Sequence, residues 1–84
     1  MKKIFLLGAT GSVGQNTLKV IAENKDLFSL IGIAADSNLV EFNKICDLFN
    51  PKYLFLNDPH KRSEINLNRG QIVLNSYAEL ESIF

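Results

Sequence analysis

The stretch IFLLGATGSVG at residues 4–14 narrows the possible folds of this chain more than any other segment, because an apolar run leads directly into a glycine-rich turn. The uninterrupted apolar residues 4–7 predict a strand that is covered on both faces, as in a parallel sheet. Gly8, Gly11 and Gly14 follow at spacings of three, and a helix-forming segment comes next. This order predicts the opening unit of a doubly wound α/β fold.

Each glycine of the turn has a separate expected task. Gly8 lets the chain turn sharply, Gly11 lets a phosphate approach the backbone, and Gly14 lets the helix pack on the strand. The free N–H groups and the dipole of the helix favour an anion there, typically a dinucleotide pyrophosphate. We expect the hydroxyls of Thr10 and Ser12 both to meet that phosphate and to cap the helix. The alternative is a tight turn without a ligand.

The rest of the chain alternates between strand and helix patterns. Strands are predicted over 4–7, 29–34, 53–56 and 71–74, and helices over 12–23, 39–49, about 59–67, and from 75 or 76 to the end. Asn38 and Glu41 have the spacing of a capping pair, with Asn38 as the N-cap. Right-handed crossovers would give a Rossmann-like open parallel sheet with helices on both faces. In the doubly wound order the fourth strand lies beyond the first, with a crevice beside the glycine turn.

The predicted sheet ends after its fourth strand with one edge bare. We therefore expect residues 1–84 to be a partial N-terminal dinucleotide-binding domain of a larger protein, whose catalytic and C-terminal domains are absent from this sequence. A length of 84 residues allows a single domain.

Composition excludes several other classes of protein. Nine basic residues balance nine acidic ones, which gives no electrostatic case for nucleic acid or an anionic membrane. No apolar run has the length of a membrane span, and no signal-peptide core follows the N-terminus, so we expect a cytoplasmic protein. Cys46, the single cysteine, falls on the apolar face of the second helix, which predicts a buried thiol and not a nucleophile.

The remaining polar residues predict no catalytic centre. His60, Lys61 and Arg62 form a small basic patch that we interpret as solvated surface, because no motif places a partner acid beside the histidine. Glu79 and Glu81 lie two residues apart on a predicted helix, so they face different directions and are poor metal ligands. The sequence contains no recognisable metal cluster, nucleophile triad or paired catalytic carboxylates.

Several segments together resemble one enzyme family. They are KKI at 2–4, GATGSVG at 8–14, NTLKVI at 16–21, AADSN at 34–38 and FNPKY at 49–53. Over residues 1–60 these segments are similar to the opening of 1-deoxy-D-xylulose 5-phosphate reductoisomerase. The glycine turn alone is shared with many reductases and epimerases, whereas the combination is more specific.

The resemblance implies part of an oxidoreductase of the methylerythritol phosphate pathway of isoprenoid biosynthesis. Such an enzyme isomerises and reduces a phosphosugar, depends on NADPH and on a divalent cation (Mg²⁺ or Mn²⁺), and forms a homodimer. By position, the resemblance assigns the cofactor phosphates to Thr10, Gly11, Ser12 and Val13, and the adenosine end to Asp36, Ser37 and Asn38. It places the metal ligands beyond this chain, so the 84 residues alone are expected to be catalytically incompetent.

The cofactor choice is the point at which residue chemistry and resemblance differ. Asp36 lies 22 residues after Gly14, near the spacing at which an acid accepts a bond from the ribose 2′-OH of NAD. In the family a glycine and a basic residue usually stand at the positions of Asp36 and Ser37. Ser37 and Asn38 can nevertheless donate hydrogen bonds to a phosphate, and Asp36 can turn outward. We expect NADPH, with a weaker preference over NADH than a basic residue would give.

Two alternatives remain open from the sequence. One is half of an epimerase-like short-chain reductase, which shares the Gly-Ala-Thr-Gly turn and would carry a tyrosine and a lysine four residues apart further along. The other is a non-catalytic dinucleotide sensor that also binds a protein partner.

Overall fold

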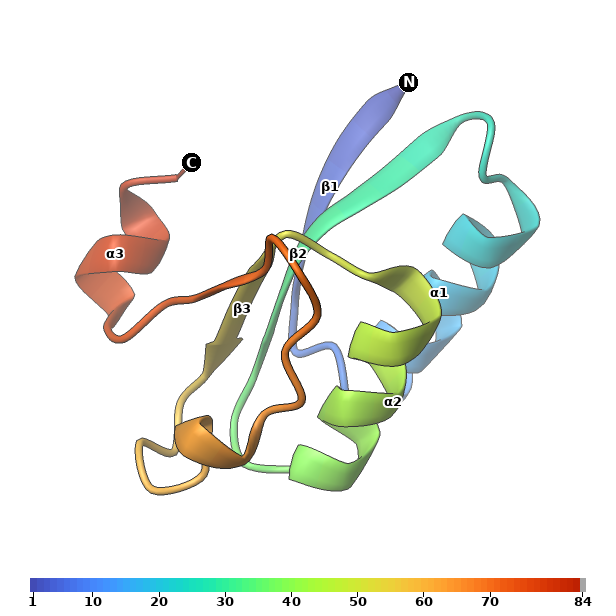
Figure 1. Cartoon of the computed structure of the whole chain (residues 1–84). Coiled ribbons are helices and arrows are strands. Elements are labelled where there is room, and N and C mark those ends of the chain that lie inside the picture. The colour runs from blue at the N-terminus through green and yellow to red at the C-terminus, as the bar shows by residue number, and fades with distance from the viewer. Residues whose placement is uncertain (84) are drawn as a thin grey trace.

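The computed structural model describes residues 1–83 and contains a four-stranded parallel sheet. Helices lie on both faces of this sheet (Figure 1). The strands are β1 (Lys2–Leu7), β2 (Phe28–Ala35), β3 (Tyr53–Leu56) and β4 (Ile72–Val73). The helices are α1 (Ser12–Glu23), α2 (Leu39–Phe49) and α3 (Tyr77–Glu81), with a 3-10 turn η1 (Arg62–Glu64) between β3 and β4. The predicted Rossmann-like α/β class is confirmed.

The predicted position of the fourth strand is wrong. The strand order is β1-β2-β3-β4, so β4 lies beside β3 and not beyond β1. The backbone N–H groups of Ile72 and Leu74 donate to the carbonyls of Lys52 and Leu54, each at 2.8 Å. The connection between β3 and β4 stays on the face that carries α1 and α2, where Ile65 joins their core. Right-handed crossovers on one face extend a sheet in one direction, so β1 is left at an edge of the described sheet.

The C-terminal third also differs locally from the sequence prediction. Between residues 59 and 67 the structure contains only η1 and turns, because this polar segment has a single buried side chain, Ile65, and no apolar stripe for a helix. Ser76, and not Asn75, is the N-cap of α3. The helix ends at Glu81 instead of continuing, and Phe84 lies outside the described residues.

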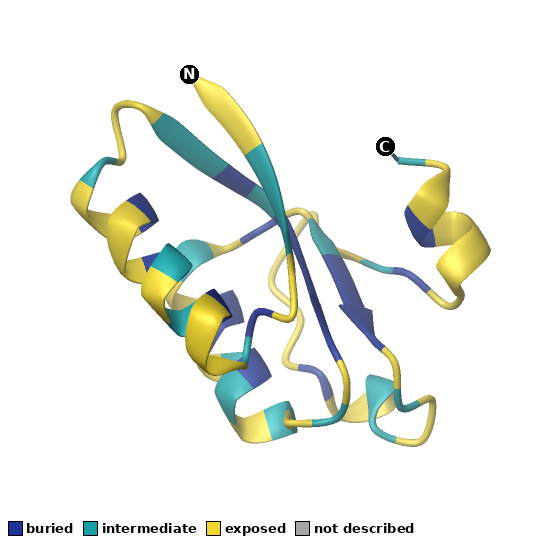
Figure 2. Cartoon of the chain, turned by 180° about the vertical axis from the view of Figure 1, so that it is seen from behind, coloured by how far each residue is buried: buried dark blue, intermediate teal, exposed yellow. Residues whose placement is uncertain are grey.

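Two hydrophobic clusters hold the layers together. The larger lies between the sheet and α1 and α2, whose inner faces are buried and outer faces exposed (Figure 2). The smaller lies on the opposite face and consists of Ala34, Phe55, Leu74 and Leu80, the last from α3. The buried residues of α1 are Gly14, Leu18 and Ile21, and those of α2 are Phe42, Ile45 and Cys46.

Cys46 is fully buried in the larger cluster, as predicted. Burial raises the pKa of its thiol to about 12, because a thiolate would lose its hydration there.

Local polar contacts fix the start of α2. The side chain of Asn38 accepts a hydrogen bond from the Glu41 N–H at 3.3 Å, which confirms the predicted N-cap. The Glu41 carboxylate accepts a bond from the Gln15 side chain at 3.2 Å and forms an ion pair with Lys44 at 3.3 Å. The hydrogen bond from Gln15 is the main cause that lowers the pKa of the Glu41 carboxyl, and the hydrogen bond and charge of Lys44 lower it further. The bond from Gln15 links α1 to α2 beside the glycine turn.

Candidate functional site

The three glycines of the turn differ in what the fold requires of them. Gly8 has a φ of +67°, a left-handed conformation that favours glycine. A Cβ at Gly14 would overlap the carbonyl oxygen of Gly8 and lie 2.8 Å from the Cα of Ala9. Gly11 has an ordinary φ of −75°, and a Cβ there would make only a normal contact, 3.5 Å from the Gly8 oxygen. Turn geometry therefore explains why residue 8 is glycine, and packing explains why residue 14 is glycine. Neither explains the glycine at position 11.

Helix α1 begins at the exposed side of this turn. Gly11 is its N-cap, in an extended conformation, and no side chain caps the helix. The expectation that Thr10 and Ser12 cap α1 is therefore wrong, because Ser12 is already the first helical residue. The helical ladder starts with the N–H of Gln15 donating to the Gly11 carbonyl at 2.9 Å. The N–H groups of residues 12–14 precede this bond and remain donors at the helix start. Ser12 and Val13 are exposed there.

Parallel pairing brings the loop after β2 to the same edge as the glycine turn. Leu7 lies opposite Ala34, and the Ala9 N–H donates to the Ala34 carbonyl at 3.0 Å. Asp36, which follows β2, is exposed. The turn and the loop at residues 36–38 thus lie beside each other at the carboxyl ends of β1 and β2, where ligands bind in open α/β sheets.

A cavity of about 370 Å³ opens at this edge. It lies between the ends of β1, β2 and β3 and helix α3, with Phe55 and Leu80 among its apolar walls and Gly8, Asp36 and Asn57 among its linings. The cavity lies beside the glycine turn, as predicted, since Leu7 and Gly8 line it, but β4 does not border it because β4 is not a neighbour of β1. Residues 10–13, 37 and 38 do not line it, so of the seven predicted site residues only Asp36 does.

Asp36, Ser37 and Asn38 each have a hydrogen-bonding partner in the structure. The Asn57 side-chain amide donates to the Asp36 carboxylate at 3.0 Å. The Lys61 ammonium donates to the Ser37 carbonyl at 3.0 Å. The side-chain oxygen of Asn38 is occupied as the cap of α2.

Sequence reasoning missed the role of Arg62. Its guanidinium donates to the carbonyls of Leu56 at 2.6 Å, Asn75 at 2.7 Å and Asn57 at 3.2 Å. It also stacks over the Phe55 ring, 5.1 Å from the centroid. A single half-buried side chain therefore fastens the end of β3 to the segment that follows β4.

The predicted solvated patch is thus only partly right. His60 is exposed, but Lys61 and Arg62 are half-buried and bonded to backbone carbonyls. Nothing in the sequence distinguishes these cations from surface ones, since their partners are carbonyl groups of other segments. The positive charge of the two residues is the only feature of the sequence that could have pointed to these contacts.

Among residues 1–83, no group of three or more His, Cys, Asp or Glu side chains is placed to hold a metal ion. Glu79, one of the two acids considered above, accepts a bond from the Asn75 N–H at 2.7 Å at the start of α3. None of the described helices has the length and apolar character needed to cross a membrane.

Comparison with known proteins identifies relatives over nearly all of the chain. The family model described as 1-deoxy-D-xylulose 5-phosphate reductoisomerase matches residues 4–81. The enzyme of that name from Proteus mirabilis is 35% identical over 81 residues, which are 96% of this chain and 19% of the relative. The one from Buchnera aphidicola subsp. Acyrthosiphon pisum is 43% identical over 58 residues, 69% of this chain and 15% of the relative.

A solved structure of a relative agrees with this assignment. The 1-deoxy-D-xylulose 5-phosphate reductoisomerase from Zymomonas mobilis, in complex with NADPH, superposes with a TM-score of 0.72 at 30% identity, covering 76% of this chain and 17% of that one. The present chain therefore spans less than a fifth of the length of these relatives. Because the family model matches residues 4–81, the chain belongs to the 1-deoxy-D-xylulose 5-phosphate reductoisomerase family.

Proposed function

We propose that this chain forms part of the NADPH-binding domain of a 1-deoxy-D-xylulose 5-phosphate reductoisomerase. The observation that carries the proposal is Gly11. Neither its conformation nor its packing requires glycine, yet the position opens onto the free N–H groups of α1. A missing side chain at this point is explained by a ligand that must approach the backbone closely, as a pyrophosphate does.

The residues around Gly11 fit such a ligand. In our proposal Thr10, Gly11, Ser12 and Val13 bind the cofactor phosphates, chiefly through backbone N–H groups and the two hydroxyls. Helix α1 is 12 residues long, so its dipole adds favourable potential at that end. Asp36, Ser37 and Asn38 border the adenosine ribose. The NADPH complex of the Zymomonas mobilis relative supports this choice of cofactor.

When bound, NADPH supplies the hydride for the reduction. The role of this chain is to hold and orient the cofactor at the carboxyl edge of the sheet. Gly8 and Gly14 set the backbone of the turn, and the helix start meets the negative charge. We assign no catalytic residue among the described residues.

The activity of the whole enzyme is part of the same proposal. By its family, the complete protein would isomerise and reduce deoxyxylulose phosphate in isoprenoid synthesis, as a cytoplasmic homodimer that uses Mg²⁺ or Mn²⁺. The described residues do not fit a divalent cation, since no three potential ligands cluster among them. We therefore place the metal ligands and the phosphosugar pocket outside residues 1–84, and expect the chain alone to lack reductoisomerase activity.

Calorimetric titration of the chain with NADPH tests the proposal directly. We expect saturable binding that an excess of NADP⁺ displaces, because both molecules share the pyrophosphate. Adding deoxyxylulose phosphate and Mg²⁺ should cause no oxidation of NADPH by the purified chain. Absence of binding heat and of displacement would contradict the cofactor role, whereas metal-dependent turnover would contradict the assignment of catalysis to other residues.

A further inference from the structure

The loop that follows β2 has the wrong charge for a 2′-phosphate. Asp36 stands where an acid ordinarily accepts a bond from a ribose 2′-OH, and a carboxylate there repels a phosphate on the same oxygen. Ser37 and Asn38 can donate hydrogen bonds to a phosphate, but neither carries a charge that would offset the charge of Asp36. If NADPH binds here, a cation from another segment must offset the charge of Asp36.

Lys61 provides a cation at this loop. Its ammonium donates to the Ser37 carbonyl at 3.0 Å, although 24 residues separate the two in sequence. An ammonium has three N–H donors, and this bond uses one of them. Within residues 1–83 the ion pair found is Lys44–Glu41, so no described carboxylate neutralises Lys61. A positive charge with donors to spare therefore lies beside Ser37.

The sheet itself fixes the segment that carries Lys61. The N–H of Asn57 donates to the Ala35 carbonyl, and the N–H of Asp58 donates to the Asp36 carbonyl, each at 2.9 Å. The Lys61 N–H then donates to the Asp58 carbonyl at 3.2 Å, which closes a turn. Lys61 is half-buried. Backbone pairing thus places the Lys61 backbone beside the loop, and the half-buried side chain then reaches the Ser37 carbonyl.

The same segment restrains the carboxylate that would oppose a phosphate. Asn57 donates its side-chain amide to one oxygen of Asp36 at 3.0 Å. This bond disperses part of the negative charge and holds the carboxylate in one orientation, toward the end of β3. The segment after β3 therefore both restrains the carboxylate of Asp36 and supplies the positive charge of Lys61.

We propose that Lys61 is a specificity-determining residue of this site, and that its ammonium binds the 2′-phosphate of NADPH. The proposal rests on the dinucleotide site proposed above and names the residue that distinguishes NADPH from NADH in it. A lysine acts on phosphate as a point charge, so it needs proximity and not a bidentate geometry.

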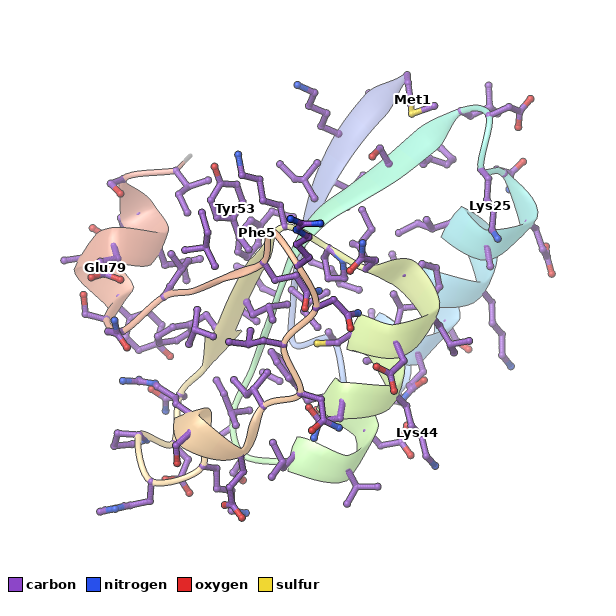
Figure 3. All side chains as sticks on the ribbon, viewed as in Figure 1. Met1, Phe5, Lys25, Lys44, Tyr53 and Glu79 are labelled. Atoms are coloured by element: carbon purple, nitrogen blue, oxygen red, sulfur yellow. The ribbon has the colours of Figure 1, made fainter. Side chains whose placement is uncertain are left out.

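The test compares Lys61→Met with Lys44→Met, which removes the same charge from the outer surface of α2 (Figure 3). Dissociation constants for NADPH and NADH are measured by calorimetry on the 84-residue chain and both variants. Loss of a charged hydrogen bond predicts that Lys61→Met weakens NADPH binding by about tenfold. NADH binding should not change, and Lys44→Met should alter neither constant. Lys61→Arg keeps the charge and should retain the preference for NADPH.

The adenosine half can be tested by itself with 2′,5′-ADP and 5′-AMP, which differ by the 2′-phosphate. Lys61→Met should weaken the first and leave the second unchanged. If Lys61→Met weakens NADPH and NADH equally, Lys61 only holds the loop and the proposal is overturned. If the unmodified chain binds neither dinucleotide, the proposed cofactor site itself fails, which is a distinguishable result.

Discussion

The Cα of Gly14 lies so close to the carbonyl oxygen of Gly8 that a Cβ on Gly14 would overlap that oxygen. The first turn of α1 therefore packs directly on the backbone of Gly8 and Ala9, the two residues that follow β1. This contact fixes where α1 starts, and with it the direction in which the N–H groups of its first turn point.

Replacing Gly14 by alanine should destabilise the fold, because the overlapping atoms belong to the backbone and cannot rotate away. We expect a loss of about 1–3 kcal/mol in the free energy of unfolding, measured by urea denaturation. Gly11→Ser is the matched control, since a Cβ at Gly11 meets only a 3.5 Å contact and serine is a favourable N-cap. Equal losses in the two variants would contradict the packing role of Gly14.

Gly11→Val should abolish dinucleotide binding while helix content stays nearly constant. The added side chain would occupy the path by which a phosphate reaches the backbone. Calorimetry measures the binding, and circular dichroism measures the helix content. Ala22→Val places the same isopropyl side chain at an exposed position of α1 and should bind normally. Unchanged affinity in Gly11→Val would show that no phosphate approaches this turn.

The double variant Asp36→Gly/Ser37→Arg should tighten NADPH binding more than NADH binding. It removes a carboxylate that repels a 2′-phosphate and adds a guanidinium that can bind one with two hydrogen bonds. The quantity to measure is the ratio of the two dissociation constants. Asp26→Gly, which removes an exposed carboxylate elsewhere, should leave the ratio unchanged. No change in the double variant would mean that this loop does not face the ribose.

The buried thiol of Cys46 should make the fold less stable at alkaline pH. Its pKa is raised from 9.0 to about 12, so above pH 9 the thiol ionises in the unfolded chain before it does in the folded one. Its contribution is therefore complete below pH 9 and decreases by about 1.4 kcal/mol per pH unit between the two values.

Urea denaturation at pH 8 and pH 10 measures this effect. Cys46→Ala removes the titrating group, so its stability should fall less between these conditions than that of the parent chain. The same burial predicts very slow reaction of the native thiol with Ellman's reagent. Parallel losses in parent and variant would rule out the contribution of Cys46.

Arg62→Met should cost about 2–3 kcal/mol of stability, because three backbone carbonyls lose a charged donor. Thermal denaturation followed by circular dichroism measures the change. Arg69→Met is the control, because Arg69 is exposed and its replacement should change stability by no more than about 0.5 kcal/mol. Similar melting temperatures for the two variants would indicate that Arg62 does not fasten β3 to the segment after β4.

The elements that could be predicted from the sequence are those with local signals. The bounds of α1 and α2 agree with prediction, because a glycine turn, the Asn38 cap and the Asn50-Pro51 stop lie within a few residues of the ends they set. The burial of Cys46 followed from helical spacing in the same way. These features depend on residues that are neighbours along the chain. The dinucleotide roles of residues 10–13 and 36–38 stay predictions.

The strand order and the surroundings of Asp36 depend on long-range contacts that the sequence does not display. Strand β4 lies beside β3 because the crossover stays on the face of α1 and α2, where Ile65 reaches their core. No local sequence pattern indicates which face of the sheet a crossover connection will cover. The contacts of Lys61 and Arg62 likewise join segments 5 to 24 residues apart and end on backbone carbonyls, which every residue carries. A sequence shows that a charge is present, but only the folded chain determines which carbonyl or ligand lies within its reach.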